Sequence, residues 1–213
     1  MLVLALDTAT PAVTVALCED GEPLAESTVV DPRRHGELLA PGIGAVFSAA
    51  GRRLSEVEAI VVGVGPGPYT GLRVGLVTAQ TLGHVLGVPV DGVCTLDALA
   101  LDAVVLDPGL DGGFLVATDA RRKEVYWARY AGGDRIDGPG VSTAADLGWD
   151  GPTVGLGAQL YPEALPDGRE PVHPRAAALA RHYAMGRPLL PPLPLYLRQP
   201  DAAAPGQRKS VLR

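Results

Sequence analysis

The sequence lacks the features that membrane, secreted and disulfide-stapled proteins require. No apolar run is long enough to cross a bilayer, and Asp7 interrupts the apolar amino terminus, which no basic segment precedes. We therefore expect no membrane segment and no signal peptide. The two cysteines, Cys18 and Cys94, fall within expected strands. Isolated strand cysteines are typical of buried, reduced thiols in a cytoplasmic protein, so we expect neither a disulfide nor a cysteine metal pair.

Cationic charge is also scarce. The chain has 18 Lys and Arg residues against 24 Asp and Glu residues, a net charge of −6, and its basic residues are scattered. Dominant binding to nucleic acid needs a cationic surface that displaces counterions. If the protein acts on RNA, we expect a partner to make most of the contacts with the RNA. The one basic cluster near a terminus, residues 208–213, is expected to be a solvated end.

Patterns for metal-dependent or nucleophilic catalysis are missing. The histidines have no metal-ligand spacing; they are His35, His84, His173 and His182. There is no Gly-x-Ser-x-Gly elbow and no evident Cys–His pair. A metal-dependent transferase or a peptidase is therefore the least favoured class, and we expect no metal site and no catalytic residue of these kinds.

What the sequence does contain is enough apolar residue, 47% of 213, for one substantial core or two small ones. Apolar periodicity in the first half predicts three antiparallel strands followed by helix, strand, helix and strand. The expected ranges are Leu2–Leu6, Ala12–Leu17, Pro23–Val30, His35–Ala50, Ile60–Val64, Leu72–Leu86 and Val88–Val93. This order resembles the ribonuclease-H-like lobe of the actin, hexokinase and Hsp70 group.

The second half is less regular. We expect a strand pair around the turn 119–122, a short strand, a loop over 132–139 and a helix. The expected strands are Phe114–Thr118, Val125–Tyr130 and Thr153–Leu156, and the helix is Arg175–Met185. Asp, Pro and Gly residues replace apolar periodicity near 101–113, which predicts a lobe boundary there. The expected fold is therefore α/β with two lobes, 1–101 and a reduced 102–213.

A glycine-rich loop is the most informative local feature. The expected strand Ile60–Val64 leads into Gly-Pro-Gly-Pro-Tyr-Thr-Gly at Gly65–Gly71, and a helix follows. Strand, glycine turn and helix start is a geometry that presents backbone N–H groups to an anion, and Arg73 adds further donors. The alternative is that the glycines only form a tight crossover between strand and helix.

The wording of this loop, GPGPYTGLRVG, resembles the signature of the TsaB (YeaZ-type) family. Three further segments match in order: LALDTAT at Leu4–Thr10, DARRKEVYWARY at Asp119–Tyr130 and PLYLRQPDA at Pro194–Ala202. One departure lies in the signature, where Pro68 replaces the usual serine. A hydroxyl and an N–H are lost there, which counts against the interpretation that this loop binds phosphate.

The resemblance implies a cytoplasmic, non-catalytic subunit of bacterial tRNA threonylcarbamoyladenosine synthesis. Such a subunit binds and activates TsaD, the catalytic paralogue, and a small ATPase, TsaE, recycles the assembly. It implies contact with tRNA only through the complex, a homodimer when the partner is absent, and room for ATP or ADP at the intersubunit interface. A competing hypothesis is an ATP-dependent small-molecule kinase or ATPase of the actin-like group.

The kinase hypothesis depends on Asp7, because an acidic residue in this turn positions a metal–phosphate complex in the actin-like group. The alternative is an Asx-type turn in which Asp7 bonds its own backbone. The matching second turn, 119–122, has no glycine to let a phosphate approach. The nucleotide-binding residues implied together are Asp7, Thr8, Gly65, Gly67, Tyr69, Thr70, Gly71 and Arg73.

The helix Leu72–Leu86 is apolar around most of its circumference, so we expect it to be covered on more than one side. Gly75, Ala79 and Gly83, spaced by four, predict a ridge that another helix approaches closely. That helix is His35–Ala50 of the same lobe, a further subunit, or both. The expected interface residues are His35, Leu38, Leu39, Gly42, Gly75, Thr78, Ala79, Leu82 and Gly83.

Overall fold

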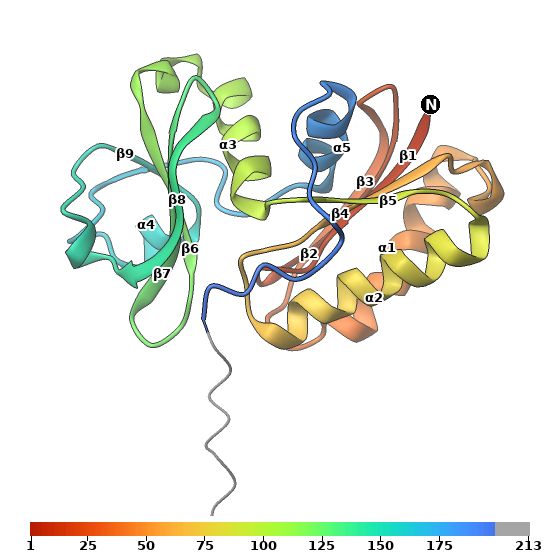
Figure 1. Cartoon of the computed structure of the whole chain (residues 1–213), viewed down its shortest axis with the longest axis horizontal. Helices are drawn as coiled ribbons and strands as arrows, with labels where there is room; N and C mark the ends of the chain where they lie inside the picture. Colours follow the sequence, from red (N-terminus) through yellow and green to blue (C-terminus); the bar gives the residue numbers. More distant parts are fainter. Residues whose placement is uncertain (199–213) are drawn as a thin grey trace, which may run out of the picture.

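The structure, a computed structural model, describes residues 1–198 (Figure 1). It has two five-stranded sheets side by side, each with helices on its faces, which confirms the expected two-lobed α/β fold (Figure 1). The basic cluster at 208–213 and the end of the Pro194–Ala202 segment lie outside the described residues. Among the residues 1–198, no helix is both long and apolar enough to cross a membrane.

The first sheet has the strand order β3-β2-β1-β4-β5. Its strands are β1 (Leu2–Asp7), β2 (Ala12–Glu19), β3 (Glu22–Val30), β4 (Ala59–Gly63) and β5 (Val90–Val93). β1, β2 and β3 pair antiparallel, whereas β1, β4 and β5 pair parallel. The β2–β3 turn holds Asp20 and Gly21 at positive φ, as an Asp-Gly hairpin requires. This topology confirms the ribonuclease-H-like order expected for the first lobe.

Side-chain size decides which helices cover each face of this sheet. The large residues of β1, Leu2, Leu4 and Leu6, pack under α1 (His35–Ala50) and α2 (Tyr69–Leu86). The opposite face carries small residues, and α5 (Ala176–Ala184), which is rich in alanine, packs there. Small residues on both surfaces let the helix approach the sheet closely. Cys18 lies in this second layer, buried and unpaired, as expected.

The second sheet has the order β10-β9-β6-β7-β8. Its strands are β6 (Phe114–Asp119), β7 (Glu124–Ala131), β8 (Asp134–Thr143), β9 (Pro152–Val154) and β10 (Asp167–Arg169). α4 (Leu156–Leu160) packs on one face, and α3 (Thr95–Leu106) packs on the other, between the lobes (Figure 1). Short 3-10 helices complete the chain at Leu54–Glu56, Pro108–Gly112 and Ala145–Leu147.

One expectation is corrected here, and one helix was not predicted. The segment 132–139, expected as a loop, turns at Gly132 and Gly133 and then forms the start of β8. The helix α3 was not predicted, and residue 101, the expected lobe boundary, falls inside it. α3 is buried around most of its surface, so its sequence has no amphipathic period. The division of the chain into an amino-terminal lobe, 1–101, and a smaller carboxy-terminal lobe, 102–213, stays a prediction.

The carboxy-terminal part of the described chain, residues 188–198, runs from the first lobe to the second, and we call it the strap. Leu190 exchanges backbone hydrogen bonds of 2.8 and 2.9 Å with Gly92, and Leu195 N–H donates to Val64 O at 2.8 Å. At its end, Arg198 donates to Ala120 O at 3.0 Å and forms an ion pair with Glu124. The strap therefore ties the β6–β7 turn to the first sheet.

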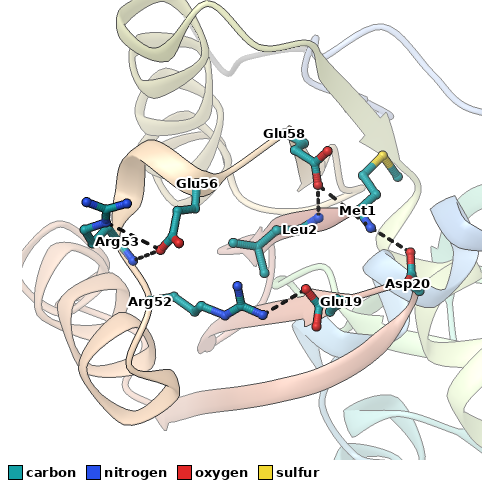
Figure 2. A network of polar contacts seen from close by, with 8 residues as sticks. All are labelled: Met1, Leu2, Glu19, Asp20, Arg52, Arg53, Glu56 and Glu58. Carbon is teal, nitrogen blue, oxygen red and sulfur yellow. Dashed lines mark hydrogen bonds and ion pairs between the residues drawn. The ribbon is translucent and has the colours of Figure 1, made fainter.

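A polar network ties the chain together at the opposite end of the first sheet (Figure 2). The Met1 ammonium lies 2.7 Å from Asp20 Oδ1, and Leu2 N–H donates to Glu58. Arg52, just after α1, reaches Glu19 of β2 at 2.9 Å. Figure 2 also shows Arg53 beside Glu56, an exposed pair directed away from the sheet. These contacts hold the end of α1 to the β1–β2 layer, far from the glycine loop.

Candidate functional site

Asp7 ends β1 and lies at the floor between the lobes, where both of its carboxylate oxygens are occupied. Oδ1 accepts a hydrogen bond of 2.6 Å from Ala9 N–H, and Oδ2 accepts one of 2.7 Å from the Thr95 hydroxyl. The side chain is fully buried, and a Cβ at Gly63 would overlap its Oδ2. Burial raises the pKa of Asp7 to about 6, against the opposing effect of the two hydrogen bonds. The first bond is the Asx-type turn that was one of the two alternatives.

The neighbouring glycines pack the loop against the β1–β2 turn. A Cβ at Gly67 would overlap Ala9 O, and Gly65 has φ +94°, a conformation that favours glycine. Gly65 also exchanges hydrogen bonds with Thr95, through its O at 2.8 Å and its N–H at 3.2 Å. These contacts leave the loop closed over Asp7. Its glycines permit this close packing, and nucleotide binding by the loop stays a prediction.

Thr8 connects this floor to α2. Its hydroxyl donates to Gly71 O at 2.7 Å and accepts from Gly75 N–H at 3.0 Å. Gly71 itself lies against Thr8 O, so a side chain there would collide with the turn. Of the eight residues implied for nucleotide binding, five are buried: Asp7, Thr8, Gly65, Gly67 and Gly71. Thr8 and Gly71 still line one pocket between the lobes, and Gly67 lines another. A metal–phosphate group does not fit against a carboxylate enclosed in this way.

The other three, Tyr69, Thr70 and Arg73, are exposed on the first turns of α2. The Tyr69 ring stacks on Tyr196 of the strap, with 5.4 Å between centroids and 20° between planes. The Arg73 guanidinium lies 3.8 Å from the Tyr69 centroid, and its Nε donates to the Tyr196 hydroxyl at 3.4 Å. Arg73 therefore holds the strap in place. The Tyr69–Tyr196 pair was not foreseen, because 127 positions separate its members.

The β6–β7 turn lies opposite the glycine loop, on the other lobe. Arg121, Arg122 and Lys123 all have positive φ, between 54° and 64°, and Asp119 Oδ1 accepts from Arg121 N–H at 2.8 Å. Two adjoining pockets of about 270 and 440 Å³ open between the turn and the loop, and both are lined by Pro68 and Arg121. The described residues include no group of three or more His, Cys, Asp or Glu side chains arranged to hold a metal.

The helix pair α1–α2 places the expected interface residues unevenly. Leu39, Gly75, Ala79 and Gly83 are buried inside the lobe and cannot contact a partner. A Cβ at Gly75 would lie 2.5 Å from Thr8 Oγ1, and one at Gly83 would overlap Val90. The ridge of small residues therefore faces the sheet, which corrects the expectation that it faces another helix. The remaining five are partly buried: His35, Leu38, Gly42, Thr78 and Leu82.

The exposed surface of α2 is a different row of residues spaced by four. It comprises Tyr69, Arg73, Val77, Thr81 and Val85, and we call it the α2 outer row. Val77 is 59% exposed and Val85 72% exposed, unusually open for aliphatic side chains in one line. α1 lies beside α2 on the same face of the sheet (Figure 1). The outer side of α2 is thus open in this chain alone.

The sequence model of the family described as "TsaD: tRNA N6-adenosine threonylcarbamoyltransferase" matches residues 29–159. An uncharacterized protein of Mycobacterium tuberculosis is 45% identical over 207 residues, covering 94% of this chain and 93% of its own. The tRNA threonylcarbamoyladenosine biosynthesis protein TsaB of Escherichia coli is 34% identical over 175 residues, covering 76% and 74%. Among solved structures, YeaZ from Pseudomonas aeruginosa superimposes with a TM-score of 0.74 at 30% identity, covering 92% of this chain and 100% of that one.

Proposed function

The chain belongs to the TsaB (YeaZ-type) family of tRNA threonylcarbamoyladenosine biosynthesis, and on that premise we propose that it is the non-catalytic subunit that binds and activates a TsaD-type transferase. In this role the partner transfers threonylcarbamate to the adenosine beside the anticodon. The chain orders the partner's site and meets tRNA through the assembly, in the cytoplasm. A TsaE-type ATPase recycles the complex, and the chain forms a homodimer when the partner is absent.

The observation that carries the non-catalytic role is the enclosure of Asp7. A kinase of the actin-like group needs this carboxylate open to a metal–phosphate complex, whereas here both oxygens accept hydrogen bonds and the side chain is fully buried. The second phosphate turn is equally unsuited, because it offers arginines in place of glycine. These facts count against the alternative of an ATP-dependent kinase or ATPase. The remaining place for ATP or ADP is the intersubunit interface, near the exposed residues Tyr69, Thr70 and Arg73.

The α2 outer row supports the partner-binding role. An exposed line of aliphatic and aromatic side chains on a helix costs solvation free energy unless a partner covers it. Tyr and Arg, the types enriched at the centres of interfaces, occupy its first two positions, Tyr69 and Arg73. We assign this row, with the adjoining face of α1, to the matching helix pair of the TsaD-type paralogue.

The test is co-purification of this chain with the TsaD-type protein of the same organism. Val77→Asp and Val85→Asp place a charge in the proposed interface without touching the core, and each is expected to weaken the complex at least tenfold. Ile136→Asp is the matched control, because Ile136 is 66% exposed but lies on β8 of the other lobe. Normal assembly by the double variant Val77→Asp/Val85→Asp would show that the partner binds elsewhere.

A further inference from the structure

The larger interlobe pocket, of about 440 Å³, is cationic and aromatic. It opens between the glycine loop, the β6–β7 turn and the strap, and its main side chains are Tyr69, Arg121, Arg122, Tyr126, Tyr196 and Arg198. None of the described residues that line it is acidic. Such a composition is unusual in a chain with a net charge of −6. We call this pocket the interlobe cleft.

One wall of the cleft is an aromatic platform. Tyr69 and Tyr196 stack and are both exposed, and Arg73 holds them from the α2 side. Tyr126 of β7 lies across from them and is buried. Exposed, rigidly held tyrosine rings are surfaces on which unpaired nucleobases stack, since every base has a flat π face.

The opposite wall supplies positive charge from a single turn. Arg121 and Arg122, which line the cleft, both adopt the left-handed conformation, which side-chain-bearing residues disfavour. The Arg121 side chain is 60% exposed, and its ion pair with Asp119 is long, at 3.4 Å. Arg33 lines the adjoining pocket beside Thr70. A phosphate in the cleft itself would meet the guanidinium groups of Arg121 and Arg122, from the β6–β7 turn.

The geometry points to this cleft as the site that receives an unpaired nucleotide of the tRNA substrate, with its base on the Tyr69–Tyr196 platform and its phosphate on Arg121. The inference rests on the proposed function, which supplies the RNA. A free nucleoside triphosphate fits less well, because the N–H groups of Gly65 and Gly75 already donate within the chain. A singly charged phosphodiester needs only the guanidinium groups. Tyr69 belongs to both the cleft and the α2 outer row, so the cleft opens next to the proposed partner interface.

The test measures binding of an unmodified tRNA transcript to the complex with the TsaD-type partner, by fluorescence anisotropy at several salt concentrations. Tyr196→Leu removes the stacking surface and is expected to weaken tRNA binding about tenfold. Arg121→Gln removes one phosphate contact and is expected to reduce the slope of log K against log salt by about 0.7 to 0.9. Arg53→Gln is the control, since Arg53 is 81% exposed at the far end of the first lobe (Figure 2).

Thermal unfolding and partner co-purification of each variant accompany the binding measurement. Loss of tRNA affinity in both cleft variants, with assembly intact and the Arg53 variant unchanged, supports the inference. Unchanged tRNA affinity in both cleft variants overturns the inference. It is also overturned if the variants lose binding of AMP or ATP but keep binding of tRNA, because the cleft would then belong to a free nucleotide. If the unaltered chain does not assemble with the partner, the proposed function is overturned. The cleft is then tested by comparing tRNA binding of the unaltered chain and the cleft variants alone at low salt.

Discussion

The Thr95 hydroxyl donates a 2.7 Å hydrogen bond to the buried Asp7 carboxylate and thereby joins the start of α3 to the end of β1. The same hydroxyl accepts from Gly65 N–H at 3.2 Å. One threonine thus links the glycine loop, the acidic turn and the interlobe helix. Here they form part of the core.

The first prediction concerns Asp7 and pH. The pKa of Asp7 is about 6 in the folded chain, against 3.8 for an ordinary Asp, so the folded state binds the proton more tightly. Asp7 therefore makes its full contribution to the free energy of unfolding below about pH 4. That contribution falls as the pH rises to 6, by about 3 kcal/mol in all. Asp7→Asn should remove this pH dependence and leave the chain at least as stable as the wild type at pH 7.5.

Urea unfolding of both chains between pH 4.5 and 7.5 checks this. A variant with the wild-type pH dependence, or one that is much less stable at pH 7.5, would mean that the ionised carboxylate is needed where it lies. The same variant should have no effect on ATP turnover by the chain, because we expect no such turnover.

The second prediction contrasts two helical glycines. Gly75→Ala places a methyl group 2.5 Å from Thr8 Oγ1 and should destabilise the chain by about 1–3 kcal/mol despite the better helix propensity of alanine. Gly44→Ala, in α1, has nothing within 4 Å of the new methyl group and should stabilise by up to about 1 kcal/mol. Denaturant midpoints of the two variants give the comparison. Equal effects would show that Gly75 is not in close contact with β1.

The third prediction concerns the buried carboxylate of α3. Asp102 is fully buried and accepts two hydrogen bonds from Arg175, at 2.6 and 2.7 Å, at the start of α5. Asp102→Leu removes this pair and should cost about 1–3 kcal/mol, because the Arg175 side chain, which is 42% exposed, can turn to water. Asp167→Leu breaks the exposed pair with Arg169 and should cost no more than about 1 kcal/mol. Similar losses in both variants would contradict a role for Asp102 in fastening α3 to α5.

An element of this fold could be predicted from the sequence where its pattern extends over only a few neighbouring positions. The first sheet, its Asp20–Gly21 hairpin and the helix pair follow from alternation, helical spacing and turn residues, which act over a few positions. α3 escaped prediction because burial on nearly all sides erases its period, and because Asp102 meets Arg175 only after 73 further residues. Its Thr95, which closes over Asp7, gave no sequence signal at all.

The candidate site shows the same limit. Spacing by four correctly places Gly75, Ala79 and Gly83 in one row, but it does not say which neighbour that row faces. The answer, that β1 and β5 fill it, depends on packing between distant segments. The Tyr69–Tyr196 platform likewise joins two motifs that the sequence presents separately. The resemblance to the family marked both motifs, although it did not show that they touch.

The proposed activation of the TsaD-type transferase is tested most directly by reconstituted threonylcarbamoyl transfer. The TsaD-type partner is supplied with threonylcarbamoyl adenylate, tRNA and the TsaE-type protein, and modified adenosine is measured in the tRNA after digestion. We expect little product without this chain, full product with it or with Asp7→Asn, and little with Val77→Asp/Val85→Asp. Equal product with and without the chain, or loss of product with Asp7→Asn in a folded, assembled complex, would contradict the proposed activation.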